Sequence, residues 1–115
     1  MDDELQERLS ANQSVFRQIN EGIESGQWPG EEDAPISFRC ECARLGCNEL
    51  VKLSLRTYER VRSDPRHFIV VPGHERRELE VVIDRTRDYL IVQKVGQAGE
   101  TAVETDPRSG PDPAD

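Results

Sequence analysis

The chain has 115 residues, of which 33% are charged and only 5% are aromatic, and its formal net charge at pH 7 is −8. A chain of this length and composition can bury only a small hydrophobic core, which excludes a large multidomain architecture. No apolar run approaches the about 18 residues of a membrane-spanning helix, so we expect no membrane insertion. The acidic start, Met1 to Glu4, does not resemble a signal peptide, and we expect a reduced, cytoplasmic protein.

The charge is divided between the centre and the ends of the chain. Residues 1–36 contain nine acids and two arginines, and residues 97–115 contain five acids and one arginine. Residues 37–96 contain twelve bases and nine acids. A mildly basic centre therefore lies between acidic arms. Two interpretations stay open: the arms only keep a small domain in solution, or one arm folds over the basic face and competes with an acidic partner.

The N-terminal segment, residues 1–26, is predicted to form an amphipathic helix over residues 3–25. Its stripe recurs at spacings of three and four residues and consists of Leu5, Leu9, Asn12, Phe16, Ile19 and Ile23. This stripe must be covered, either by the chain's own sheet or by a second copy or a partner helix. Phe16 and Ile19, at its middle, are therefore candidate partner-binding residues. An acidic linker follows over residues 27–35, with Trp28 expected to anchor it.

The three cysteines, Cys40, Cys42 and Cys47, fall within eight residues as C-x-C-x4-C. Their odd number and tight spacing disfavour a disulfide. Together with His74, which a Pro-Gly turn presents, they make a complete tetrahedral set of three thiolates and one imidazole, as in structural zinc sites. Apolar residues alternate from Ile36, so a strand would place two of the sulfurs on one face. We predict one Zn2+ per chain, with iron as the competing metal and His67 as the competing fourth ligand.

The remaining segments predict an α+β fold in which the N-terminal helix precedes a small, zinc-stapled, mostly antiparallel sheet with one short helix. A zinc-binding domain is expected over residues 36–96. Its strands are predicted at 36–42, 48–53, 68–71, 80–86 and 89–95, and its helix at 55–63, with Ser54 as the N-cap. Residues 97–115 are rich in Gly, Ala, Glu, Thr, Pro and Asp and are predicted to form a disordered acidic tail.

Several of these motifs resemble one family. F-x-C-E-C-x4-C over residues 38–47, L-x2-Y-E-x-V-R over 55–62 and V-P-G-H-E over 71–75 are similar to a family of small, largely uncharacterised bacterial proteins of the actinomycete kind. A-N-x3-F-R-x-I-N over residues 11–20 resembles the N-terminal helix of that family. The resemblance covers about residues 9–95. It implies that the three cysteines and His74 belong to one site, and it supplies no activity.

Three function classes follow from these observations. The leading one is a non-enzymatic zinc-binding module that binds another protein, with a regulatory role. Its contacts would be Phe16, Ile19 and a basic helix face formed by Arg56, Arg60 and Arg62, which suits an acidic partner. A homodimer through the N-terminal helix is the other arrangement that we consider.

The second class is a nucleic-acid-binding accessory protein, and the third is an enzyme. The second would use eight arginines: Arg39, Arg44, Arg56, Arg60, Arg62, Arg66, Arg76 and Arg77. A pI of about 4.8 and the lack of interleaved aromatic residues disfavour it. An enzyme would need an open metal site with only the three cysteines as ligands, His74 as general base and Glu41 or Glu75 as acid, and no common catalytic motif is present.

Overall fold

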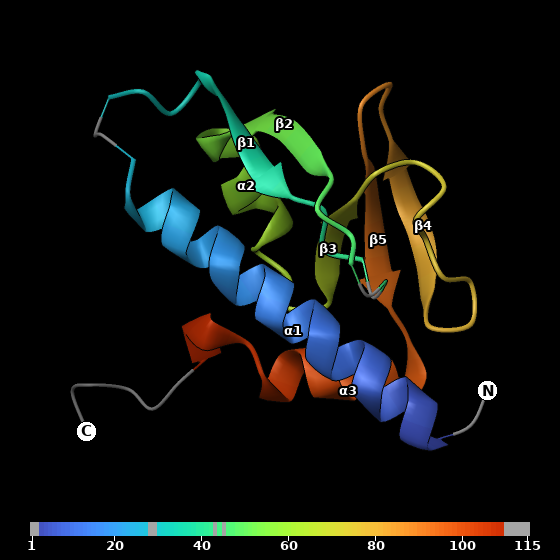
Figure 1. Cartoon of the computed structure of the whole chain (residues 1–115). Helices are drawn as coiled ribbons and strands as arrows, with labels where there is room; N and C mark the ends of the chain where they lie inside the picture. The colour runs from blue at the N-terminus through green and yellow to red at the C-terminus, as the bar shows by residue number, and fades with distance from the viewer. Residues whose placement is uncertain (1–2, 28–29, 43, 45, 110–115) are drawn as a thin grey trace, which may run out of the picture.

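The computed structural model describes residues 3–27, 30–42, 44 and 46–109 (Figure 1). In chain order the elements are α1 (Asp3–Ser25), β1 (Pro35–Arg39), β2 (Leu50–Ser54), α2 (Leu55–Val61), β3 (His67–Val70), β4 (Glu80–Arg85), β5 (Leu90–Lys94), α3 (Gly96–Glu104) and the 3-10 turn η1 (Pro107–Ser109). The predicted α+β class is confirmed. Trp28 and residues 110–115 lie outside the described residues. Within the described ranges, no helix has the length and apolar character needed to cross a membrane.

The strands form two antiparallel sheets. β1 pairs with β2, and β3 and β4 flank β5 in a three-stranded sheet. The β4–β5 hairpin closes where the Thr86 N–H donates to the Tyr89 carbonyl over 2.9 Å. All five strands were predicted, the first from its alternating pattern and β3 from a continuous apolar run, although β1 ends at Arg39 rather than at Cys42. The cysteines therefore follow the regular strand.

One core cluster connects the two sheets. The Phe38 ring of β1 stacks on the Tyr58 ring of α2 with centroids 4.4 Å apart. Both rings belong to the same buried cluster as Phe68 and Val92 of the larger sheet. α2 is fixed at its start by the predicted cap, because Ser54 Oγ accepts from the Thr57 N–H over 3.1 Å. This cap directs α2 back across the space between the sheets.

α1 lies across the front of the molecule, with α3 beside it (Figure 1). It packs on its own chain through part of the predicted stripe and through polar side chains that the stripe did not include. Leu9 is buried with Leu79 and Ala98, and Ile23 packs against the main core cluster. Gln13, Arg17 and Asn20 are at most 2% exposed, whereas Val15 and Ile19 are 52% and 39% exposed. The reason is that the body beneath α1 offers polar partners, including backbone carbonyls and buried carboxylates. α1 therefore keeps part of its apolar surface on the outside.

The prediction of a disordered tail from residue 97 is wrong where α3 and η1 form, that is, over residues 97–104 and 107–109. Ala98, Gly99 and Ala102 face inwards on α3. A Cβ at position 99 would come within 2.9 Å of the Lys94 carbonyl, so only glycine permits this close approach. Small residues that resemble a disordered composition here serve to pack a helix against β5.

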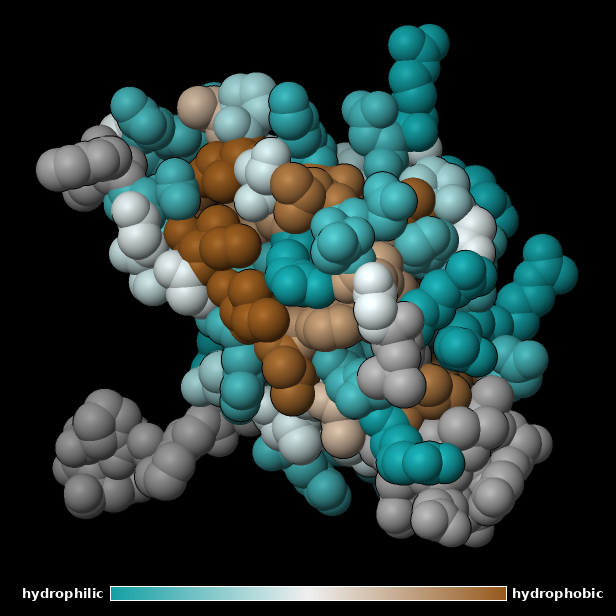
Figure 2. All heavy atoms as spheres, viewed as in Figure 1, coloured by the Kyte–Doolittle hydropathy of each residue, from teal (hydrophilic) through white to brown (hydrophobic). Residues whose placement is uncertain are grey.

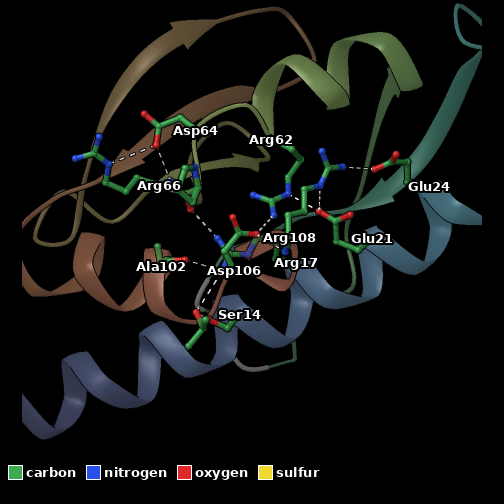
Figure 3. A network of polar contacts seen from close by, with 12 residues as sticks. Ser14, Arg17, Glu21, Glu24, Arg62, Asp64, Arg66, Ala102, Asp106 and Arg108 are labelled. Carbon is green, nitrogen blue, oxygen red and sulfur yellow. Dashed lines mark hydrogen bonds and ion pairs between the residues drawn. The ribbon is translucent and has the colours of Figure 1, made fainter. Parts of the chain in front are cut away.

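Ion pairs hold the C-terminal segment to α1 and α2 (Figure 3). Arg62, at the end of α2, pairs with Glu21 of α1 and with Asp106. Arg108 pairs with Glu21 and Glu24 over 2.9 and 2.5 Å, and with Glu59 of α2 over 2.9 Å. These contacts fix residues 106–108 between the two helices.

Candidate metal centre

The first two cysteines continue the direction of β1 beyond its last paired residue. The Cys40 N–H donates to the Glu49 carbonyl over 3.0 Å, which extends the contact between β1 and the segment leading into β2. Cys40 and Cys42 are 1% and 0% exposed. The two-residue spacing of an extended segment therefore brings both side chains inwards, as the alternation predicted.

A tight loop returns the third cysteine to the first two. The Cys47 N–H donates to the Arg44 carbonyl over 3.2 Å, and Gly46 adopts a φ of 78°, a left-handed conformation that glycine accommodates without strain. Arg39 Nη2 donates to the Cys47 carbonyl over 2.6 Å. The loop is thus held from both sides, and Cys47 is half-buried.

His74 reaches the cysteines from the turn after β3. Its N–H donates to the Val71 carbonyl over 2.9 Å, and Gly73 has a φ of 94°. Arg44 Nη2 donates to the Gly73 carbonyl over 3.0 Å, so the cysteine loop and the histidine turn are directly connected. A Pro-Gly turn therefore presents the imidazole as the sequence predicted.

The four side chains lie at distances compatible with a shared metal ion. Their ligand atoms all lie within 4.8 Å of one another. His74 Nδ1 is 3.6 Å from the sulfurs of both Cys40 and Cys47. A tetrahedral zinc ion, with Zn–S and Zn–N bonds of about 2.3 and 2.0–2.1 Å, would separate sulfur and nitrogen ligands by about 3.6 Å. The residues present therefore fit a tetrahedral metal, and Nδ1 is the histidine atom that faces the sulfurs.

The pKa values of the three sulfurs shift in different directions. A hydrogen bond from Cys40 lowers the pKa of Cys42, and the same contact, together with burial, raises the pKa of Cys40. The Val71 N–H donates to Cys40 Sγ over 3.2 Å. Backbone donors of this kind orient metal ligands and stabilise their negative charge. Burial raises the pKa of Cys47 as well, so among the three sulfurs the surroundings favour the thiolate, the form that binds metals, at Cys42.

The second histidine lies outside this cluster. His67 Nε2 is 3.2 Å from Gln93 Oε1 and 3.5 Å from Asp64 Oδ2. His74 rather than His67 is therefore the imidazole that joins the cysteines, as the sequence predicted.

Glu41 is a residue of the site region whose role the sequence did not predict. Its carboxylate is fully buried and accepts hydrogen bonds from Asn20 Nδ2 over 2.8 Å, from the Ile69 N–H over 2.9 Å and from the Tyr58 hydroxyl over 3.2 Å. Burial raises the pKa of Glu41, and the hydrogen bonds from Asn20 and Ile69 act against that rise. Glu41 therefore ties the cysteine segment to α1, α2 and β3. Its carboxylate oxygens accept hydrogen bonds from these elements, so Glu41 is not placed as a general acid beside His74.

The predicted basic helix face needs a correction at Arg62. Arg56 and Arg60 are exposed on α2, and Arg56 pairs with Asp33 over 2.7 Å. Arg62 is only 3% exposed, because Glu21 and Asp106 draw it into the molecule. Arg62 therefore cannot meet a partner. Phe16 is half-buried and Ile19 is exposed, so the second predicted contact surface is accessible in part.

The eight arginines proposed for nucleic-acid binding do not form one exposed set. Arg62 is buried, Arg39 and Arg76 are half-buried, and Arg39 contacts the ring of Phe16 at 4.8 Å from its centroid. Three of the eight arginines are therefore not freely exposed for contact with phosphates.

Comparisons of the chain with models of protein families, with curated proteins and with solved structures find no match. Function therefore has to be inferred from the residues and their geometry.

Proposed function

We propose that this chain is a small, non-enzymatic zinc-binding protein that acts in the cytoplasm as a protein-interaction module with a regulatory role. Cys40, Cys42, Cys47 and His74 would hold one Zn2+ per chain. The observation that carries the proposal is the four-ligand cluster with its 3.6 Å sulfur–nitrogen separations. Three thiolates and one imidazole suit zinc better than they suit the harder cations, and iron is the competing metal.

The four ligands support a structural rather than a catalytic role. A zinc ion with four protein ligands has no open position for an activated water molecule. The bound ion would cross-link the end of β1, the loop before β2 and the turn after β3. Its contribution would be folding free energy, which a chain with a small core needs most.

The interaction role rests on the apolar face of α1, which consists of Val15, Phe16 and Ile19. Val15 and Ile19 are 52% and 39% exposed. Residues 9–20 contain one charged residue, Arg17, and this residue points inwards and is fully buried. An uncharged, apolar helix face on a chain rich in charges is typical of a surface that another protein covers.

Two experiments test the two parts of this function. Elemental analysis of the purified protein should give one zinc per chain, and Co2+ substitution should give the spectrum of a tetrahedral thiolate-rich site. A photo-reactive amino acid at Val15, introduced in the native cells, should cross-link a protein, whereas the same amino acid at Val81 on β4 should not. A metal-free protein of unchanged stability would refute the zinc site. Equal cross-linking at both positions would refute the interaction surface.

A further inference from the structure

A groove lies between α1 and the loop that carries Cys47. Its volume is about 380 Å3, and its walls include Val15 and Phe16 on one side and Gly46, Cys47 and Asn48 on the other. Figure 2 shows a line of strongly apolar residues that follows the course of α1 in Figure 1. The groove therefore extends the apolar face of α1 towards the metal centre.

Polar groups without carboxylate partners surround this apolar floor. The Arg39 guanidinium lies over the Phe16 ring, and neither Arg39 nor Arg44 takes part in an ion pair within the described residues. The side-chain amide of Asn12, which also lines the groove, makes no hydrogen bond to another described residue. These groups can donate to acceptors of an occupant.

The charges near the groove favour an acidic occupant. Glu21 and Glu24 come after the groove residues of α1 in the sequence. Glu21 pairs with Arg62 and Arg108, and Glu24 pairs with Arg108. In the described part of the cysteine loop, Arg44 is exposed. The next acidic residue along the chain is Glu49, which is also exposed. Among the described residues that line the groove, Arg39 is the only arginine, lysine, aspartate or glutamate, so the lining itself is positive.

We propose that this groove binds an amphipathic segment of another protein, which inserts an apolar side chain between Val15 and Phe16 on one side and the cysteine loop on the other, and places a carboxylate against Arg39. This is the helix-in-groove or extended-peptide mode of recognition, in which apolar anchors supply affinity and charge supplies specificity. The inference rests on the proposed function, since it names the chemistry of the partner for the same surface. Cys47 lies in one wall of the groove, so metal binding also shapes the site.

The test uses the zinc-loaded full-length chain and a displayed library of random peptides about twelve residues long. Selected peptides are synthesised, and their affinities are measured by fluorescence anisotropy. We expect a consensus with a large apolar residue and at least one Asp or Glu. Val15→Glu and Arg39→Gln should each weaken binding roughly tenfold or more, as for a central contact. The matched control is Val81→Glu, because Val81 on β4 is 48% exposed against 52% for Val15, and this change should leave affinity unaltered.

Several results would overturn the inference. These are the failure to select any peptide, a consensus without a carboxylate, or equal affinity of the wild type and Val15→Glu. A wild-type dimer in light scattering that Val15→Glu converts to a monomer would assign the groove to a second copy instead. Circular dichroism and metal content check each variant, and if Arg39→Gln does not fold, the salt dependence of wild-type binding decides the electrostatic part. Cross-linking in cells does not depend on the partner's charge, so the proposed function and this inference can fail separately.

Discussion

Arg17 is the largest of the side chains that the structure buries completely. Its guanidinium donates to the Pro65 carbonyl over 2.7 Å and to the Ala102 carbonyl over 2.9 Å, and it lies 4.7 Å from the centroid of the Phe68 ring. Burial, with the nearby charge of Arg62, lowers the pKa of Arg17. One side chain therefore connects α1 to the segment before β3 and to α3.

We expect Arg17→Met to destabilise the protein by about 3 kcal/mol or more, because two buried carbonyls lose their donor. The measurement is urea unfolding in excess zinc. Phe16→Ala on the neighbouring position serves as the comparison and should cost about 1–2 kcal/mol, since its ring is only half-buried and a fully buried ring would cost about 3–5 kcal/mol. A larger loss for Phe16→Ala than for Arg17→Met would show that α1 is held by its apolar face after all.

The elements show which features a sequence can predict. The spacing of apolar residues predicted α1 over residues 3–25, the bounds that the structure has. It predicted the inward-facing Leu9 and Ile23, but not the burial of Arg17 and Asn20, because the partners of these two residues come from distant segments. The clustering of the candidate ligands was predictable because the three cysteines fall within eight residues and His74 follows a Pro-Gly turn. The burial of Glu41 was not predictable, because alternation places its side chain on the face opposite the two cysteines, where a strand residue is ordinarily exposed.

α3 provides a direct test of the correction to the C-terminal tail. Ending the chain after Val95 removes the Ala102 carbonyl that Arg17 contacts and the Asp106 carboxylate that pairs with buried Arg62. We expect a loss of about 3 kcal/mol or more, because buried Arg62 keeps only Glu21 of its two carboxylate partners and buried Arg17 loses an acceptor. Thermal unfolding measures it. Ending the chain after Ser109 is the control and should change stability little. Equal melting temperatures of all three chains would mean that α3 contributes nothing.

The contacts of Arg108 predict a pH dependence. Burial and a hydrogen bond shared with Glu59 raise the pKa of Glu24 to about 7, whereas Arg108 lowers the pKa of Glu59 to about 2. Because the folded state holds the Glu24 proton more tightly than the unfolded chain does, the protonated carboxyl stabilises the fold. This contribution is complete below the unfolded pKa of 4.5 and is lost as the pH rises through about 7. Glu59 acts in the opposite sense: its ionised carboxylate stabilises the fold above pH 4.5, and this contribution is lost as the pH falls through about 2.

Glu24→Gln should therefore become more stable relative to the wild type as the pH rises from about 5 to 8, because the amide cannot lose the proton. Unfolding free energies of both proteins across this range measure the effect. Glu104→Gln, at an exposed glutamate of α3, is the control and should give a constant difference. If the stability of Glu24→Gln relative to the wild type instead falls as the pH rises, the Arg108 ion pair outweighs the burial of Glu24.

At the scale of the whole molecule, the proposed zinc would join the two sheets. The cysteines belong to the segment between β1 and β2, and His74 follows β3 of the three-stranded sheet. The sheets are also connected by the core cluster around Phe38, Tyr58 and Phe68, and by the hydrogen bonds between Glu41 and Ile69 of β3. A small core gives limited stability, so a bound metal would carry a large share of the free energy that fixes one sheet against the other.

Removing the metal should therefore loosen the molecule unevenly. We expect a chelator to lower the melting temperature and to increase amide hydrogen exchange first in residues 36–54 and 71–75, while the β4–β5 hairpin keeps its protection. Cys42→Ser should reproduce this state, and added zinc should not reverse it, because ligand loss and metal loss remove the same folding free energy. Zinc affinity should also fall as the pH is lowered, since protons compete for the sulfurs and for His74. An unchanged melting temperature after verified metal removal would contradict the structural role. Equal loosening of both sheets would place the connection between them in the hydrophobic core instead.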